Sequence, residues 1–233
     1  MTDFKVEIYR AADHPERNAV FIRGHSSVLK DYGVTMITSF KEQKWVHQPS
    51  VYCLVASTPS GEMIGGIRIH IADFITPLPL ETALHKMDTG IHDLVKSYAG
   101  EGVGELCGLW NAKKVARVGI SFVLTRAAVA VMPYLQFRVL MGICAEYSLN
   151  MFKNVGFEID VSLGDNGEFP YPTTAYITRV VGILKSSSLA TAHPVDRKKI
   201  LDLRNSPVQE RIEQGKKGEF TVNYNLRVSP NVP

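Results

Sequence analysis

Several features that mark secreted, membrane-spanning and metal-binding proteins are scarce in this sequence of 233 residues. It contains three cysteines (Cys53, Cys107 and Cys144) without a CxxC spacing, so a disulfide framework is excluded and buried reduced thiols are expected. The longest apolar stretch, 120–132, is interrupted by Arg126 and is too short to cross a bilayer. Residues 1–20 lack an apolar core, so we predict no signal peptide, no membrane association and a cytoplasmic location.

Motifs that identify common enzyme classes are missing as well. The seven histidines show no HExxH or other ligand spacing, so we expect no metal site. The sequence has neither a GxSxG elbow nor a Walker loop, which excludes the common hydrolases and nucleoside triphosphatases. What the sequence does have is an ordinary globular composition, with 45% hydrophobic and 21% charged residues. Its length fits one large domain, or one domain with an appendage.

The charged residues are distributed unevenly along the chain. Residues 1–110 carry 10 basic and 13 acidic side chains, whereas residues 111–233 carry 16 and 10. The basic residues are not interleaved with aromatic ones and form no helical stripe, so we predict no nucleic-acid partner. A local anionic ligand accounts for the excess of positive charge equally well.

Hydrophobic periodicity and turn residues predict alternating strands and helices. A strand is expected at 4–11, followed by a helix with Asp13 as its N-cap, and the segment Thr58 to Gly61 joins two strands of a hairpin. The remaining elements are expected in this order: a two-helix insert at 74–101, a strand at 104–110, a helix at 119–132, a strand at 137–144, a helix at 147–154, strands at 157–161 and 174–183, a charged helical region at 194–214, and an edge strand at 219–228.

The composition changes after Lys185, where three serines resemble a linker. We therefore divide the chain into a core domain at 1–185 and a C-terminal extension at 186–233. An unpaired alternating strand invites association, so the strand at 219–228 is expected to pair with a sheet edge, either in its own chain or in a twin subunit of a homodimer.

The segment 105–124, ELCGLWNAKKVARVGISFVL, is the most informative part of the sequence. Lys113, Lys114 and Arg117 lie between a buried strand and a buried helix, and Gly119 begins that helix. The first amides of a helix are unpaired and lie at the positive end of its dipole, so they can bind an anion such as a pyrophosphate. A solvated basic loop is the alternative interpretation.

This segment resembles the GNAT superfamily of N-acetyltransferases. In that family an Arg/Gln-x-x-Gly-x-Gly/Ala motif opens a helix and holds the pyrophosphate of coenzyme A. The matching positions are Glu105, Leu106, Leu109, Gly119, Ile120 and Leu124. Two positions depart from the motif, because Ala116 replaces the Arg/Gln, with Arg117 one place late, and Ser121 replaces the final Gly/Ala.

A second motif and the layout of the chain extend the resemblance. Tyr147 to Phe157 is similar to the short helix that precedes a Gly-Phe pair in the family, with Phe152 four residues ahead of Gly156. The run Gly66 to Ile69, a long insert and then Glu105 is similar to acyl-homoserine-lactone synthases and N-acyl amino acid synthases. Their Glu-Leu-Ser-Arg strand is here Glu-Leu-Cys-Gly. The resemblance implies an α/β fold with a mixed, mostly antiparallel central sheet flanked by helices, plus a helix-strand extension.

The resemblance also implies roles for individual residues. Glu105 is expected to be the general base, or to order the water that serves as one. Tyr147, or Ser148 beside it, is expected to protonate the leaving thiolate, because the family's tyrosine position is Phe152 here; a coenzyme A thiol can also leave without a dedicated acid. Trp110 is expected either in the acyl pocket or in the core. The residues expected to contact the acyl group, the thioester and the coenzyme are Leu109, Trp110, Asn111, Lys113, Lys114, Arg117, Val118, Gly119, Ile120 and Ser121.

Two classes of function stay open at this point. The first is an N-acyltransferase that moves an acetyl or other acyl group from acetyl-CoA or another acyl-CoA to a small-molecule primary amine. It has no permanently bound cofactor, and acyl carrier protein is an alternative donor, as in N-acyl amino acid synthases. The second is a catalytically silent protein of the same fold that binds a ligand in the basic cleft. The insert at 74–101 is expected to wall the acceptor or acyl pocket.

Overall fold

The computed structural model describes residues 2–31, 33 and 43–228. Its strands join into one ten-stranded sheet in the order β6-β8-β5-β4-β3-β2-β1-β10-β9, with β7 paired to β8. The strands are β1 (Thr2–Arg10), β2 (Val51–Ser57), β3 (Met63–Ile71), β4 (Val103–Asn111), β5 (Val139–Ala145), β6 (Glu158–Ile159), β7 (Glu168–Pro170), β8 (Ile177–Ile183), β9 (Val208–Gly215) and β10 (Gly218–Asn225). All pairs are antiparallel except β4 with β5 and β1 with β10.

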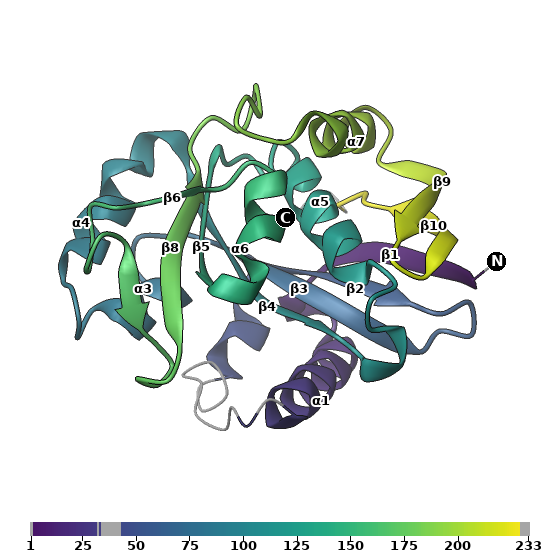
Figure 1. The fold of residues 1–233 in the computed structure, drawn as a ribbon, viewed down its shortest axis with the longest axis horizontal. Helices are drawn as coiled ribbons and strands as arrows, with labels where there is room; N and C mark the ends of the chain where they lie inside the picture. Colours follow the sequence, from purple (N-terminus) through teal and green to yellow (C-terminus); the bar gives the residue numbers. More distant parts are fainter. Residues whose placement is uncertain (1, 32, 34–42, 229–233) are drawn as a thin grey trace.

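Helices cover both faces of this sheet (Figure 1). The α-helices are α1 (Pro15–Asp31), α3 (Pro79–Leu84), α4 (Gly90–Ser97), α5 (Ile120–Val131), α6 (Glu146–Asn154) and α7 (Pro194–Asn205). Short 3-10 turns lie at Ala11–Asp13, Gln43–His47, Ala99–Glu101 and Lys113–Val115. No described helix is long and apolar enough to cross a membrane.

The core consists of three clusters that follow the alternation of side chains across the strands. The largest cluster lies on one face and packs α5, α6 and α7 against the sheet, with Leu124 and Ile200 fully buried. The other face carries two clusters, one under α3 and α4 and one under α1. The candidate site described below lies between these two smaller clusters.

The expected hairpin at 51–71, the two helices of the insert and the central strands and helices are all present. Asp13 is not the N-cap of α1, because it lies in the preceding 3-10 turn and pairs with Arg10 instead. Gly24 lies within α1 where the helix packs on the Trp110 ring. A Cβ at this position would lie 2.2 Å from that ring, so only glycine fits the contact.

The charged segment after Pro207 was expected to be helical, and that prediction is wrong. Residues Val208–Gly215 form β9, which pairs with β10 as the last strand of the sheet. The strand β10 in turn pairs with β1 of the same chain. The C-terminal residues thereby extend the central sheet beyond β1, as the right side of Figure 1 shows.

Candidate functional site

The strands β4 and β5 separate shortly after they meet. Their parallel pairing covers Val103 to Glu105 on β4 and Val139 to Met141 on β5. Beyond these residues β4 continues beside β3, whereas β5 continues beside β8. A cavity of about 630 Å³ occupies this opening and reaches both faces of the sheet.

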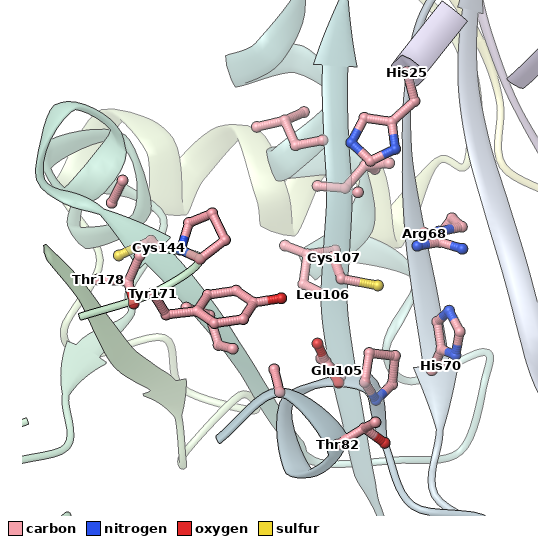
Figure 2. Close-up of a pocket in the computed structure, with 18 of the residues that line it drawn as sticks. His25, Arg68, His70, Thr82, Glu105, Leu106, Cys107, Cys144, Tyr171 and Thr178 are labelled. Atoms are coloured by element: carbon pink, nitrogen blue, oxygen red, sulfur yellow. The ribbon is translucent and has the colours of Figure 1, made fainter. Parts of the chain in front are cut away.

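The two ends of the cavity differ in their lining. Residues from α1, the 3-10 turn at Gln43–His47, β3 and α3 line one end, and they include His25, Trp45, Arg68 and His70. The other end is lined by β5, α6 and the chain before β8, where apolar and hydroxyl-bearing side chains predominate. Figure 2 shows Glu105 and Cys107 on β4 between these two groups, with the Tyr171 hydroxyl aimed across the cavity toward β4.

A β-bulge disrupts the pairing of β4 beside the cavity. Arg68 pairs with Cys107 and Gly66 with Trp110, so Gly108 and Leu109 oppose the single residue Ile67. Gly108 has φ 63°, a left-handed conformation that glycine adopts without strain. The bulge leaves these two residues without register partners on β3, and both line the cavity wall.

Glu105 lies at the point where β4 and β5 part, and it is 2% exposed. Its Oε2 accepts a hydrogen bond of 2.7 Å from the Leu80 amide at the start of α3. Burial raises the pKa of Glu105 to about 8, against the opposing effects of the Leu80 hydrogen bond and the Arg68 charge. A carboxylate with a pKa in this range is a stronger base than an ordinary one, and it is free to accept a proton from a substrate once the pH approaches 8.

The insert at 74–101 contributes to this site in two ways. Its helix α3 supplies the amide that holds Glu105, and Thr76, Pro77 and Thr82 line the cavity. Within α3 the Glu81 side chain accepts a hydrogen bond from the Leu78 amide and also contacts the His92 ring. The insert therefore forms one wall of the cavity, as expected from its position before β4.

The loop between β4 and α5 has the geometry of an anion site. Arg117 and Gly119 have φ of 68° and 116°, and the amides of Ile120 and Ser121 have no hydrogen-bond partner among the described residues. The Ser121 hydroxyl donates to Asn111 Oδ1 at 2.7 Å, which ties the helix start to the end of β4. These unpaired amides lie at the positive end of the α5 dipole.

The charged side chains of this loop differ in their surroundings. Lys113 and Arg117 are exposed, and neither forms an ion pair with a described residue. Lys114 forms an ion pair with Glu62 from the turn between β2 and β3. Part of the positive charge predicted for this loop is therefore neutralised by an acid that is distant in the sequence.

Other predicted site residues have mixed positions relative to the cavity. Leu109 lines it, and so does Tyr147, whose side chain is 85% exposed. Trp110 belongs to the core rather than to the acyl pocket, because its ring packs against Phe21 under α1. Asn111 and the loop at 113–121 lie outside the lining of the cavity.

Sequence reasoning missed several lining residues. Arg68 lies in the run Gly66 to Ile69, but no motif marks it as a site residue, and no motif marks His25, Trp45 or Tyr171 either. Each of them reaches the cavity from a different element, so no local pattern connects them. Among the described residues, no group of three or more histidine, cysteine or acidic side chains could hold a metal ion.

Solved structures with similar folds include three that span most of this chain. The N-acyl amino acid synthase FeeM from uncultured soil microbes aligns over 76% of this chain and 89% of its own, with 12% identity and a TM-score of 0.60. The CoA-dependent acyl-homoserine lactone synthase BjaI, with SAM and isopentyl-CoA, aligns over 96% and 92%, with 10% identity and a TM-score of 0.54. Escherichia coli ElaA aligns over 77% and 98%, with 5% identity and a TM-score of 0.54.

These likenesses confirm the expected fold, a mixed and mostly antiparallel sheet flanked by helices in the GNAT arrangement. No family model matches the sequence, and no curated protein matches it either.

Proposed function

We propose that this protein is an N-acyltransferase that moves an acyl group from a thioester to a primary amine. The observation that carries the proposal is the position of Glu105, a buried carboxyl group with a raised pKa at the parting of β4 and β5. Acyl transfer requires a base of this kind beside a cleft that admits the two substrates from different sides. FeeM and BjaI, whose folds are similar, are named as an N-acyl amino acid synthase and a CoA-dependent acyl-homoserine lactone synthase.

In the proposed reaction the amine nitrogen attacks the thioester carbonyl carbon while Glu105 takes a proton from the nitrogen. The carbonyl oxygen becomes an oxyanion, which the amides at the bulge of β4 stabilise, that of Leu109 among them. The carbon–sulfur bond then breaks, the amide product forms, and the thiolate takes a proton from Tyr147 or from water. Tyr147 is the proposed acid because it lies on the cavity wall contributed by α6.

We assign the donor as acetyl-CoA or a longer acyl-CoA, with its pyrophosphate at the amides of Gly119 to Ser121. The Val118 amide, which was also expected to bind it, donates instead to the Val115 carbonyl at 3.2 Å. The support for this position is the unpaired amides at the start of α5 and the exposed side chains of Lys113 and Arg117. The cavity of about 630 Å³ has room for more than an acetyl group beside the amine. Acyl carrier protein is the alternative donor, since it presents its acyl group as a thioester too.

Calorimetry with acetyl-CoA, decanoyl-CoA and decanoyl-loaded acyl carrier protein tests the donor. We expect CoA thioesters to bind, and Arg117→Ala to weaken that binding less at high salt, because salt screens exposed charges. Arg23→Ala is the matched control, since Arg23 is an exposed arginine of α1, on the other face of the sheet. Absence of CoA binding, with tight binding of the carrier protein, would transfer the donor role to that protein. Binding of a thioester without turnover of any amine would indicate a catalytically silent member of the fold.

A further inference from the structure

Arg68 is a buried cation without a carboxylate partner among the described residues. Its side chain is 2% exposed, and no described carboxylate lies within ion-pair distance of it. Its Nε has no hydrogen-bond partner, although it is fully buried. Arginines are almost never buried unless they are paired, because the desolvation of the charge must be offset.

The titratable groups around Arg68 in the described part of the chain do not supply the missing negative charge. Burial, and then the charge of Arg68, lower the pKa of His25 to about 3 and that of His70 well below its ordinary value, so both rings are neutral. Glu105, with its pKa of about 8, holds a proton at neutral pH. Cys107, beside Arg68 on β4, has a pKa raised to about 12 by burial.

The surrounding chain holds the guanidinium in place at the cavity. Its Cζ lies 4.2 Å from the centre of the Trp45 ring, which stacks on one side. Gly108 lies on another side, and a Cβ there would come within 3.0 Å of Arg68 Nε. A side chain at position 108 would therefore displace the guanidinium, and Figure 2 shows Arg68 between His25 and His70 at the end of the cavity away from Tyr171.

Arg68 and Glu105 are close enough to contact one small molecule. Arg68 pairs with Cys107, and Glu105 lies two residues before Cys107, so the two side chains are diagonal neighbours on one face of the sheet. Diagonal neighbours in a sheet are about 7–8 Å apart. An α-amino acid carries its nitrogen and its carboxylate on the same carbon. Because the side chains of Arg68 and Glu105 both extend into the gap between them, a molecule of this size can contact both.

We infer that Arg68 binds a carboxylate of the amine acceptor, so that the acceptor is an amino acid or a close analogue. This inference deepens the proposed function, on which it rests, by naming the class of acceptor. The planar guanidinium offers paired donors that match the two carboxylate oxygens. The incoming carboxylate also supplies the negative charge that compensates the buried positive charge of Arg68. The carboxylate in turn holds the amino group on the side of the cavity where Glu105 can take its proton.

Two product-like ligands test the inference by binding alone. N-decanoylglycine and N-decanoylglycinamide differ in one charge, and calorimetry on the full chain compares their affinities. We expect the carboxylate to bind about 10- to 100-fold more tightly, the range for a hydrogen bond to a charged group. Arg68→Gln should remove this preference, and Arg68→Lys should retain part of it.

Arg17→Gln is the matched control, because Arg17 also stacks on an aromatic ring, at 4.3 Å over Tyr9, but does not line the cavity. Equal affinity of the two ligands in the wild-type protein would overturn the inference, as would a preference that survives in Arg68→Gln. If Arg68→Gln does not fold, the inference is tested by the wild-type protein and Arg68→Lys. An undiminished preference for N-decanoylglycine in Arg68→Lys counts against a paired contact between the guanidinium and the carboxylate. Tighter binding of N-decanoyl-aminomethylphosphonate than of N-decanoylglycine would overturn the inference, because it would show that Arg68 binds a phosphoryl group of the acceptor and not a carboxylate.

A transfer assay from decanoyl-CoA separates this inference from the proposed function. If glycinamide is acylated as fast as glycine, the enzyme is an acyltransferase but the carboxylate contact is wrong. If neither these amines nor any proteinogenic amino acid is acylated, from decanoyl-CoA or from decanoyl-loaded acyl carrier protein, while the binding preference holds, the proposed function fails and the carboxylate site remains.

Discussion

At the scale of single residues, the surroundings of Glu105 determine what the site can do. The carboxyl group is buried at the parting of two strands, and one backbone amide holds it there. Burial raises its pKa to about 8, so the proton-free form needed for a base becomes populated as the pH rises past this value.

We therefore expect the rate of acyl transfer to rise with pH, with a midpoint near pH 8 and a plateau above it. Measurement of kcat between pH 6 and 10, with the acceptor amine saturating, checks this. The amine of the acceptor also titrates in this range, so acceptors with different amine pKa values are compared. A midpoint that follows the acceptor instead of staying with the enzyme would assign the titration to the substrate.

The same carboxyl group predicts a pH dependence of stability. In the folded protein it holds its proton up to about pH 8, whereas in the unfolded chain it loses the proton near its ordinary value of 4.5. Unfolding therefore releases a proton between these values, and the contribution of Glu105 to the free energy of unfolding falls as the pH rises. Urea titrations of the wild type and of Glu105→Gln at pH 5 and pH 8.5 should show the wild type losing stability relative to the variant. An equal pH dependence in the two proteins would contradict the raised pKa.

The sequence predicted a site role for Glu105 but none for Arg68. The physical reason is that the surroundings of Arg68 come from residues distant in the sequence. Glu105 belongs to a motif in which its neighbours along the chain also match, whereas the role of Arg68 depends on Trp45 and Gly108. Trp45 and Gly108 are far from Arg68 in the sequence. Likewise Glu62 pairs with Lys114 across 52 residues, so the charge of the basic loop could not be judged from the loop alone.

At the scale of elements, the periodicity of most central strands and helices was clear, and β9 was the principal error. Its buried charged residue, Glu213, interrupts the apolar alternation that identifies a strand. The charges along 208–214 resemble those of a solvated helix, and only the pairing with β10 makes the segment a strand. Asp13 is a separate error at a helix end, where a local ion pair with Arg10, three residues earlier, replaces the expected cap.

The hairpin of β9 and β10 also contacts the loop proposed to hold the pyrophosphate. A Cβ on Gly215 would lie 1.6 Å from the Val118 carbonyl oxygen, so the two backbones touch only because residue 215 is glycine. The hairpin therefore supports the conformation of the loop at the start of α5.

We expect Gly215→Ala to displace this loop and to weaken CoA binding, with a loss of about 1–3 kcal/mol of stability from overpacking. Calorimetry with CoA and thermal unfolding measure the two effects. Gly100→Ala is the control, because a Cβ at this position would meet nothing within 4 Å. If Gly215→Ala binds CoA as tightly as the wild type, the hairpin does not shape the site.

At the scale of the whole molecule, a buried ionic network joins the C-terminal residues to the core. Glu213 on β9 is 1% exposed and accepts hydrogen bonds from Arg126 of α5 at 3.0 Å and from Lys199 of α7 at 2.5 Å. Arg126 also pairs with Asp196 of α7 at 2.5 Å, and the Tyr224 hydroxyl donates to Glu213 at 3.2 Å. The network connects α5, α7, β9 and β10, so the C-terminal elements and the core helix stabilise one another.

Removal of Glu213 should therefore affect the whole fold rather than the hairpin alone. Glu213→Ala leaves Arg126 and Lys199 with less of their compensating charge, and breaking a buried pair in this way costs about 3–5 kcal/mol. Urea unfolding measures the loss, and Glu210→Ala, an exposed carboxylate on the same strand, should change stability by much less. A small effect of Glu213→Ala, equal to that of Glu210→Ala, would show that the C-terminal elements are not coupled to the core.

The central claim is that the opening between β4 and β5 carries out acyl transfer with Glu105 as its base, and the Glu105→Gln variant tests it most directly. Glutamine keeps the size of the side chain but cannot take a proton, so transfer should slow while the acyl thioester still binds. The measurement is the rate of amide formation from decanoyl-CoA and an amino acid at pH 8.5, by mass spectrometry, together with the calorimetric Kd for decanoyl-CoA. We predict a loss of 100-fold or more in kcat, in the range reported for general-base catalysis, with a Kd changed by less than about threefold. Unchanged amide formation by Glu105→Gln would contradict the account.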